Sequence, residues 1–447
     1  MIWSQLLSPQ RLDQKPGVNE PSRSAFEQDY DRIIFSHPFR RLQDKTQVHP
    51  LPEHDFVHTR LTHSLEVSSV GRSLGKRVGE IILQRHPQLQ SDFSLFDFGA
   101  IVAGASLAHD LGNPPFGHAG EDALSDFFLH HPNGYQFKEQ VSEAEWNDLI
   151  KFEGNAQGFR LLNKKQYGLK LTTATLGAFT KYPCPAFFPS RNKSKKSQKK
   201  FGFFQSEEDY FSRAADQLGL LPAGKTVWCR HPLAFLVEAA DDICYSIIDM
   251  EDAQRLKILS SNIVEQLLLN LIEELGHNTQ DINRVNKTLK EIDDRNERIS
   301  YLRAKSINAL TQQSAIVFTE QSSNILSGEF NGSLVGSLYN NCSSLREIEK
   351  VSVEEIYNHD TVIEIEIAGY NVMSELLKLF ITASLKVKPV GRDEKILRLI
   401  PKQFAIAKAS TPYHKAIAVL DFVSGMTDIY ATELYKKVFG IETPKHG

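Results

Sequence analysis

The sequence predicts a mostly α-helical fold, and three observations lead to that prediction. Apolar residues recur at three- and four-residue steps between Val67 and Ile82, which is the pattern of one buried helix face. The run FDFGAIVAGASLAHDLG is long enough for a buried helix, and Gly112 with the following proline pair would end it. Strand-like alternation is scarce, and DTVIEIEIA is the best short candidate for a strand.

The order of these patterns divides the 447 residues into three regions. Residues 1–57 are polar and rich in turn-forming residues, and we interpret them as an N-terminal arm. Residues 58–255 hold the strongest helical patterns and form the predicted central domain. Residues 256–447 contain several amphipathic segments, such as NIVEQLLLNLIEEL and NVMSELLKLFITASL, and form the predicted C-terminal helical region.

Composition narrows the class of protein. A hydrophobic content of 41% and a charged content of 24% are typical of a globular chain. The formal net charge of −4 argues against a protein built mainly to bind nucleic acid, although a local basic site is compatible with it. The four cysteines are scattered, which disfavours disulfides and a cysteine zinc site. With neither a signal peptide nor a long apolar span evident, we expect a cytoplasmic protein that binds no membrane.

A lysine-rich stretch, residues 185–206, interrupts the helical pattern of the central domain. Five lysines lie between positions 193 and 200, among serines and with few apolar residues. The composition favours a solvated, partly disordered loop. The alternative is a basic flap that faces phosphates or a partner molecule.

Two positions in the first half of the central domain carry candidate chemistry. Arg60 and His63 stand three residues apart at the start of a predicted helix and would share one face. His109 and Asp110 follow the buried apolar run, where a carboxylate is costly unless a cation or a donor meets it. The structural alternative for this pair is a polar helix end.

Two further positions complete the pattern. His118 and Glu121 are three residues apart and could share a face if a helix restarts after the prolines, or form an ordinary surface pair. Asp241, Tyr245 and Asp249 are spaced by four and form one stripe, which could also be a solvated helix face. Together, two imidazoles and two carboxylates make a plausible mixed nitrogen and oxygen site for a divalent metal.

The segments that carry these residues resemble a known family. RLTHSLEV, AHDLGNPPFGHAGEDAL, FEGNAQGFRLL and EAADDICYSIIDMEDA are similar, in this order, to the bacterial deoxyguanosinetriphosphate triphosphohydrolases. That family belongs to the HD-domain superfamily and is related to the mammalian SAM-and-HD dNTPase. The match extends from about Phe35 to Ala253. The resemblance therefore implies that residues 58–255 form an HD-domain metal-dependent phosphohydrolase.

The resemblance also implies a role for each candidate residue. The implied metal ligands are His63, His109, Asp110 and Asp241, with Asp242 the weaker choice for the last ligand. His118, supported by Glu121, is the implied proton-transfer residue, and Arg60 is implied to bind phosphate.

The implied substrate contacts come from several regions of the chain. Tyr245 would pack against the sugar, and Asp249 with Gln47 of the N-terminal arm would contact the 3′-hydroxyl. Asn155 and Arg160 match a segment that lines the pocket. Asn113 stands where the mammalian relatives have a histidine, which argues against proton transfer at this position.

The implied reaction is hydrolysis of a deoxynucleoside triphosphate to the deoxynucleoside and tripolyphosphate. Mn or Mg is the expected metal, and Fe or Zn would also suit the donor set. The resemblance further implies a homo-oligomer, with a hexamer as one form, and a possible nucleotide activator. The alternatives are another HD phosphohydrolase, such as a 5′-nucleotidase or phosphodiesterase, and a non-catalytic protein that senses nucleotides or binds nucleic acid.

Overall fold

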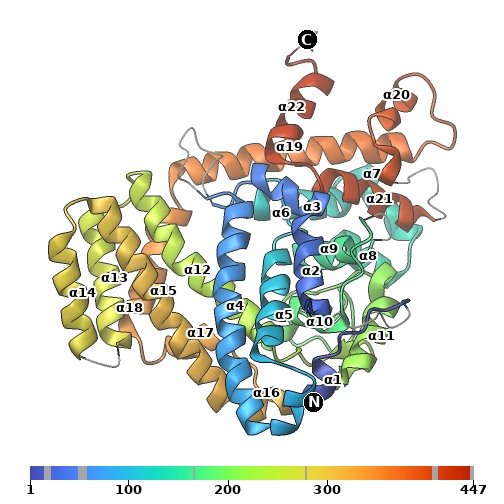
Figure 1. The fold of residues 1–447 in the computed structure, drawn as a ribbon. Helices are drawn as coiled ribbons and strands as arrows, with labels where there is room; N and C mark the ends of the chain where they lie inside the picture. Colours follow the sequence, from blue (N-terminus) through green and yellow to red (C-terminus); the bar gives the residue numbers. More distant parts are fainter. Residues whose placement is uncertain (15–21, 49–57, 165–166, 277–278, 405–410, 443–447) are drawn as a thin grey trace.

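The computed structural model describes residues 1–447 except 15–21, 49–57, 165–166, 277–278, 405–410 and 443–447, and its fold is helical (Figure 1). The first helices are α1 (Trp3–Leu6), α2 (Ala25–Ile34), α3 (His37–Arg40), α4 (Arg60–Arg85), α5 (Leu95–Ala108), α6 (Gly117–His130), α7 (Pro132–Tyr135), α8 (Glu143–Leu149), α9 (Gly154–Asn163), α10 (Thr173–Phe179), α11 (Glu208–Leu218) and α12 (Ala234–Arg255). A short antiparallel hairpin of β1 (Pro222–Gly224) and β2 (Val227–Trp228) precedes α12.

The later helices are α13 (Ser261–Leu275), α14 (Thr279–Glu291), α15 (Arg295–Glu320), α16 (Ser322–Ser327), α17 (Leu334–Leu338), α18 (Ser343–Val351), α19 (Asp360–Ser384), α20 (Arg392–Arg398), α21 (Pro412–Ser424) and α22 (Asp428–Val438). A π-helical turn, η7 (Ser352–Tyr357), lies between α18 and α19. The predicted helical class is confirmed, but the predicted strand DTVIEIEIA is wrong because it begins α19. Its alternating acidic residues gave a two-residue period, yet Val362, Gly369 and Val372 form a buried stripe at helical spacing.

Helices α4 and α5 pack closely, and this pairing positions the first half of the site. A Cβ atom added to Gly71 would lie 2.4 Å from Ser106 Oγ, and one added to Gly75 would lie 2.6 Å from the Phe98 carbonyl oxygen. Only glycine allows this approach of the two backbones. The antiparallel arrangement places the first turn of α4 beside the last turn of α5.

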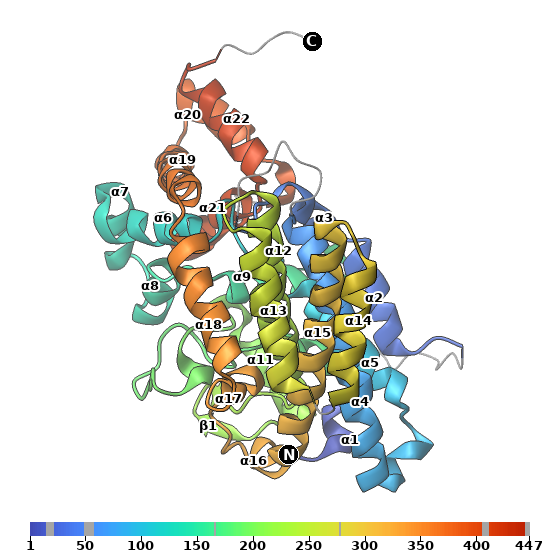
Figure 2. The same ribbon diagram turned by 90° about the vertical axis from the view of Figure 1, so that its left-hand side faces the viewer.

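Two hydrophobic clusters make up the core. One contains α4, α5, α12 and the helices from α13 to α18, and the other joins α6 and α8 to α19 and α21. Figure 1 shows α13, α14 and α15 together on one side and α19 across the top, and Figure 2 shows α1 and α22 toward opposite ends. The helices after residue 256 are thus divided between the two clusters.

The lysine-rich segment departs from the sequence prediction. Phe201, Phe203 and Phe204 are buried, and Phe203 forms a β-bridge with Pro185, whereas the lysines at 193, 195, 196 and 199 remain exposed. The prediction of a solvated, partly disordered loop is therefore wrong for its second half, because the phenylalanines anchor it in the core. Among the described residues, none of the helices combines the length and apolar character that spanning a bilayer requires.

Candidate functional site

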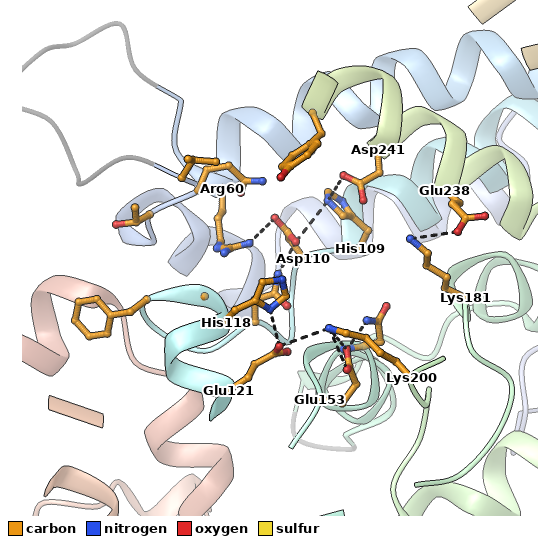
Figure 3. Close-up of a pocket in the computed structure, with 18 of the residues that line it drawn as sticks. Arg60, His109, Asp110, His118, Glu121, Glu153, Lys181, Lys200, Glu238 and Asp241 are labelled. Atoms are coloured by element: carbon orange, nitrogen blue, oxygen red, sulfur yellow. Dashed lines mark hydrogen bonds and ion pairs between the residues drawn. The ribbon is translucent and has the colours of Figure 1, made fainter. Parts of the chain in front are cut away.

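A cluster of histidine and aspartate side chains lies where α4, the end of α5 and α12 meet (Figure 3). Asp241 Oδ1 lies 3.2 Å from His63 Nε2 and 3.4 Å from His109 Nε2. Asp110 Oδ1 lies 3.5 Å from the same nitrogen of His109. The four residues predicted as metal ligands, separated by up to 178 positions in the chain, are therefore brought together.

The carboxylate charges around His109 favour a cation at this cluster. His109 Nδ1 donates to the Ser106 carbonyl oxygen at 2.7 Å, which leaves Nε2 as the free coordinating nitrogen. This buried Nε2 atom has no hydrogen-bond partner among the described residues. Burial lowers the pKa of His109, but the charges of Asp110 and Asp241 outweigh it and raise the pKa to about 9, so positive charge is favoured at Nε2, either as a proton or as a cation that replaces the proton. The orphaned nitrogen and the two carboxylates fit a divalent metal ion.

Asp110 is held on two sides. Its Oδ2 accepts a hydrogen bond from Arg60 Nη1 at 2.9 Å, and its Oδ1 accepts one from Asn113 Nδ2 at 2.5 Å. Burial raises the pKa of Asp110, but the neighbouring His109 and Arg60 charges more than compensate and lower it. Asn113 therefore orients an acid of the cluster.

A histidine–glutamate pair stands next to the cluster on α6. Phe116 takes a left-handed φ of 61° before α6 begins, so the chain turns sharply after the proline pair and the helix restarts at Gly117. His118 Nδ1 donates to Glu121 Oε2 at 2.8 Å, and Glu121 Oε1 accepts from the Gly154 amide at 2.7 Å. The bond to Glu121 raises the pKa of His118, against the smaller opposing effect of burial. The predicted shared face is confirmed.

Both groups open into one cavity of about 580 Å³. Its wall includes His109, Asp110 and Asp241 at one part and the His118–Glu121 pair at another. Figure 3 shows these side chains facing the same space. His63 lies behind the wall, with a side chain that is 3% exposed, and reaches the cluster through its Nε2 atom.

Comparison with known proteins identifies the family. The HD domain matches residues 60–155, and the phosphohydrolase-associated domain matches residues 341–437. A deoxyguanosinetriphosphate triphosphohydrolase-like protein of Synechocystis is 42% identical over 99% of this chain and 100% of its own length. One from Pseudomonas aeruginosa is 40% identical over the same shares. A deoxyguanosinetriphosphate triphosphohydrolase of Salmonella paratyphi A is 32% identical over 93% of this chain and 94% of its own length.

This chain belongs to the deoxyguanosinetriphosphate triphosphohydrolase family. It is a hydrolase with an HD phosphohydrolase domain. The HD match contains His63, His109 and Asp110, and α12 adds Asp241 from outside that match. The phosphohydrolase-associated match covers α19 and α21, whose contacts with α6 and α8 support the wall that carries His118.

The family resemblance predicted that Tyr245 and Asp249 on α12 would both contact the substrate, but only Tyr245 lines the cavity. Tyr245 lines the cavity and stacks on Tyr357, with ring centroids 5.2 Å apart. Asp249 is 5% exposed and is not part of the cavity wall; its Oδ2 accepts a hydrogen bond from the Tyr357 hydroxyl at 2.8 Å. Asp249 follows Asp241 by eight positions, which corresponds to about 12 Å along the helix axis. Asp249 therefore lies beyond the edge of the cavity.

Among the other predicted substrate residues, some line the cavity and one does not. Gln47 and Asn155 line the cavity, and Gln47 Oε1 is buried without a hydrogen-bond partner among the described residues. Arg160 matches the same pocket-lining segment as Asn155, but its own side chain is not part of the cavity wall. Its guanidinium pairs with Asp421 at 2.9 Å and with Glu207 at 2.5 Å, because it faces α21 across a buried interface. Residues 15–21 and 49–57 of the predicted arm lie outside the described residues.

The structure adds wall residues that sequence reasoning missed. Lys181 Nζ lies 3.5 Å from Glu238, and Lys200 Nζ lies 3.2 Å from Glu153 and 3.6 Å from Glu121. Both ammonium groups point toward the cavity in Figure 3. Lys200 belongs to the lysine-rich segment, so the flap alternative contained a signal for it. Lys181 and Tyr357 have no neighbouring motif that could have marked them.

Proposed function

We propose that this chain hydrolyses deoxynucleoside triphosphates to the deoxynucleoside and tripolyphosphate, by attack of water at the α-phosphate. One observation supports this reaction most. A single cavity joins the His/Asp cluster, a histidine positioned for proton transfer, basic groups for phosphates and a stacked tyrosine pair for a sugar. A simpler phosphomonoesterase has no need of all four.

The proposed metal ligands are His63, His109, Asp110 and Asp241, and Mn or Mg is the proposed ion. A divalent ion held there supplies positive charge that polarises a phosphate oxygen and activates water. The chain itself fixes the donor geometry through the Ser106 carbonyl on His109 and through Asn113 on Asp110.

Three cations can neutralise the triphosphate. Arg60, Lys181 and Lys200 line the cavity from three different segments of the chain. Each is paired with a carboxylate, at distances from 2.9 to 3.6 Å. These pairs keep the cations in place before the substrate arrives, and phosphate oxygens can then share their donors. Preorganised positive charge of this kind is the main contribution of a protein to phosphoryl transfer.

The proton is handled by His118. The bond from its Nδ1 atom to Glu121 fixes the tautomer, so that Nε2 is the atom that can exchange a proton with substrate or water. Its side chain is 81% exposed in the open cavity and is therefore accessible to a bound ligand. His118 serves either the attacking water or the 5′-oxygen of the leaving deoxynucleoside.

Selectivity for a deoxy sugar is assigned to the aromatic pair. The stack of Tyr245 on Tyr357 makes a rigid flat wall, because Tyr357 is also tied to Asp249 by its hydroxyl group. A ring packed against C2′ leaves no room for a 2′-hydroxyl. Gln47 offers its Oε1 atom, which has no hydrogen-bond partner in the described part of the chain, to the 3′-hydroxyl. The oligomer, the nucleotide activator and the cytoplasmic location stay predictions.

A substrate panel with product identification tests this function. The full chain is incubated with each deoxynucleoside triphosphate and with GTP and ATP, with Mn or Mg; after the metal is removed, the phosphate products are resolved by phosphorus NMR and the nucleoside by reversed-phase chromatography. Tripolyphosphate and deoxynucleoside in equal amounts are expected, with no turnover in chelator. Release of orthophosphate or diphosphate would instead support another HD phosphohydrolase. Nucleotide binding without turnover would support a sensor.

A further inference from the structure

The corner between α21 and α22 contacts two segments of the cavity wall that are distant in the chain. Asp428, the first residue of α22, is 5% exposed. Its Oδ1 accepts a hydrogen bond from the Phe116 amide at 3.2 Å, and its Oδ2 accepts one from the Thr46 amide at 2.9 Å, across 312 and 382 positions. Thr46 and Phe116 both line the cavity. One buried carboxylate therefore joins two parts of the wall to the C-terminal region.

A buried lysine connects the same three segments. Lys45 is 3% exposed, and its Nζ donates to the Asn113 carbonyl oxygen at 2.5 Å and to the Ser424 carbonyl oxygen at 3.0 Å. Nearby, Arg41 Nη1 donates to the Gly425 carbonyl oxygen at 3.0 Å. A buried charge is costly unless hydrogen bonds meet it, so folding favours the arrangement in which these bonds form. The corner is thus fixed against both wall segments.

The turn at Phe116 depends on support from outside its own segment. Its φ of 61° and ψ of 21° are left-handed, a conformation that is unfavourable for a bulky side chain. Such conformations persist where the surrounding structure enforces them. The bond to Asp428 does so, and so does close packing on α19, where a Cβ atom added to Gly369 would lie 2.3 Å from Phe116 Cγ. His118 follows two positions later, so this turn decides where its imidazole points.

We propose that Asp428 is a positioning residue for the hydrolytic site. It holds the turn before His118 and the segment before Gln47 in the places from which both side chains face the cavity. Asp428 is not part of the described cavity wall and acts through two backbone amides. The inference rests on the proposed function for the roles of His118 and Gln47. It gives the phosphohydrolase-associated region, residues 341–437, a part in the reaction.

Hydrogen exchange measured by mass spectrometry on the full chain tests this contact without a substrate. Asp428→Ala removes both acceptor oxygens, so exchange should become about tenfold or more faster in peptides from residues 41–48 and 113–118. The exchange of α13 should stay at the wild-type rate. Gly369→Ala should accelerate exchange in residues 113–118 alone, because its new Cβ atom meets Phe116.

Steady-state hydrolysis of the deoxynucleoside triphosphate that the wild type prefers measures the consequence for the reaction. Asp428→Asn keeps the size of the side chain and one acceptor oxygen, so it is the milder variant. Its kcat should fall about tenfold or more, because a catalytic group displaced by about 1 Å can cost about 100-fold. Bound Mn per folded chain should stay at the wild-type level. Asp393→Asn is the matched control, since Asp393 also lies in the first turn of a C-terminal helix, α20, outside the described cavity wall.

Unchanged exchange in both wall segments of Asp428→Ala would overturn the proposal. So would a wild-type kcat in Asp428→Asn, or a loss of kcat that only follows a loss of bound Mn or of folded chain, because a purely structural role would produce that loss. A wild type without hydrolysis would refute the proposed function, and the exchange measurement would still decide separately whether Asp428 holds the two segments.

Discussion

Replacing Glu121 by glutamine gives the sharpest test of the proposed proton transfer. Glutamine keeps the size of the side chain and the oxygen that accepts the Gly154 amide at 2.7 Å, so the fold should be retained. The other oxygen, which accepts from His118 at 2.8 Å, becomes an amide that donates. His118 would then carry its proton on Nε2, the atom proposed to act on substrate or water.

The expected loss follows from this one bond. A hydrogen bond to a charged group contributes about 1.5–3 kcal/mol, which corresponds to a fall in kcat of about 10- to 100-fold. The larger losses known for general acid–base residues are not expected, because the imidazole remains. Since Glu121 raises the pKa of His118, its removal should also move the limb of the pH–rate profile that reports His118 toward lower pH. This direction holds whether His118 acts as acid or base.

The assay is steady-state hydrolysis of dGTP from pH 5 to 10, with thermal unfolding as a check of the fold. Asp126→Asn is the matched control, because Asp126 also pairs with a histidine, His130 at 3.8 Å, on the same helix but outside the cavity wall. The control should keep wild-type activity and profile. A Glu121→Gln enzyme with a reduced kcat and an unmoved limb would refute the proposed link between Glu121 and His118.

Three further predictions concern metal, sugar and stability. Asp241→Asn should lower the amount of bound Mn, measured by plasma mass spectrometry. It should also reduce hydrolysis by more than the roughly 10- to 100-fold loss that is typical when a residue contacting a metal ligand, rather than the metal, is replaced. A variant with full metal content would contradict the assignment of Asp241 as a ligand. Tyr245→Ala should lower discrimination against GTP by up to about 10²-fold in kcat/KM, and an unchanged ratio would reject the steric account. Burial raises the pKa of Asp421, but the charges of Arg160 and Lys164 outweigh it and hold it at about 2, below the unfolded value. Asp421→Asn should therefore lower the free energy of unfolding, measured in urea, by about 3 kcal/mol at pH 7 and by less at pH 3. The difference arises because the stability contributed by the carboxylate is lost as the pH falls from about 4 to 2. An equal loss at the two pH values would contradict this prediction.

Much of the candidate site could be predicted because its residues stand in local patterns. The helical period around Val67 and the apolar run before His109 predicted α4 and α5, and the spacing of His118 and Glu121 predicted their shared face. These features depend on neighbours within one or two helical turns. The strand predicted at DTVIEIEIA shows the limit, because its alternating charges imitate a two-residue period.

By itself, the sequence determined the helical class and the family motifs, since both depend on short-range spacing, and the resemblance carried by those motifs implied the residues of the His/Asp cluster. Only the tertiary structure decided that Lys181, Lys200 and Tyr357 face the cavity. The tertiary structure also decided that Arg160 pairs with Asp421 and that Asp249 accepts a hydrogen bond from Tyr357 outside the cavity wall. These outcomes depend on how helices far apart in the chain pack, and the free energy of that packing comes from many buried contacts that no single segment encodes.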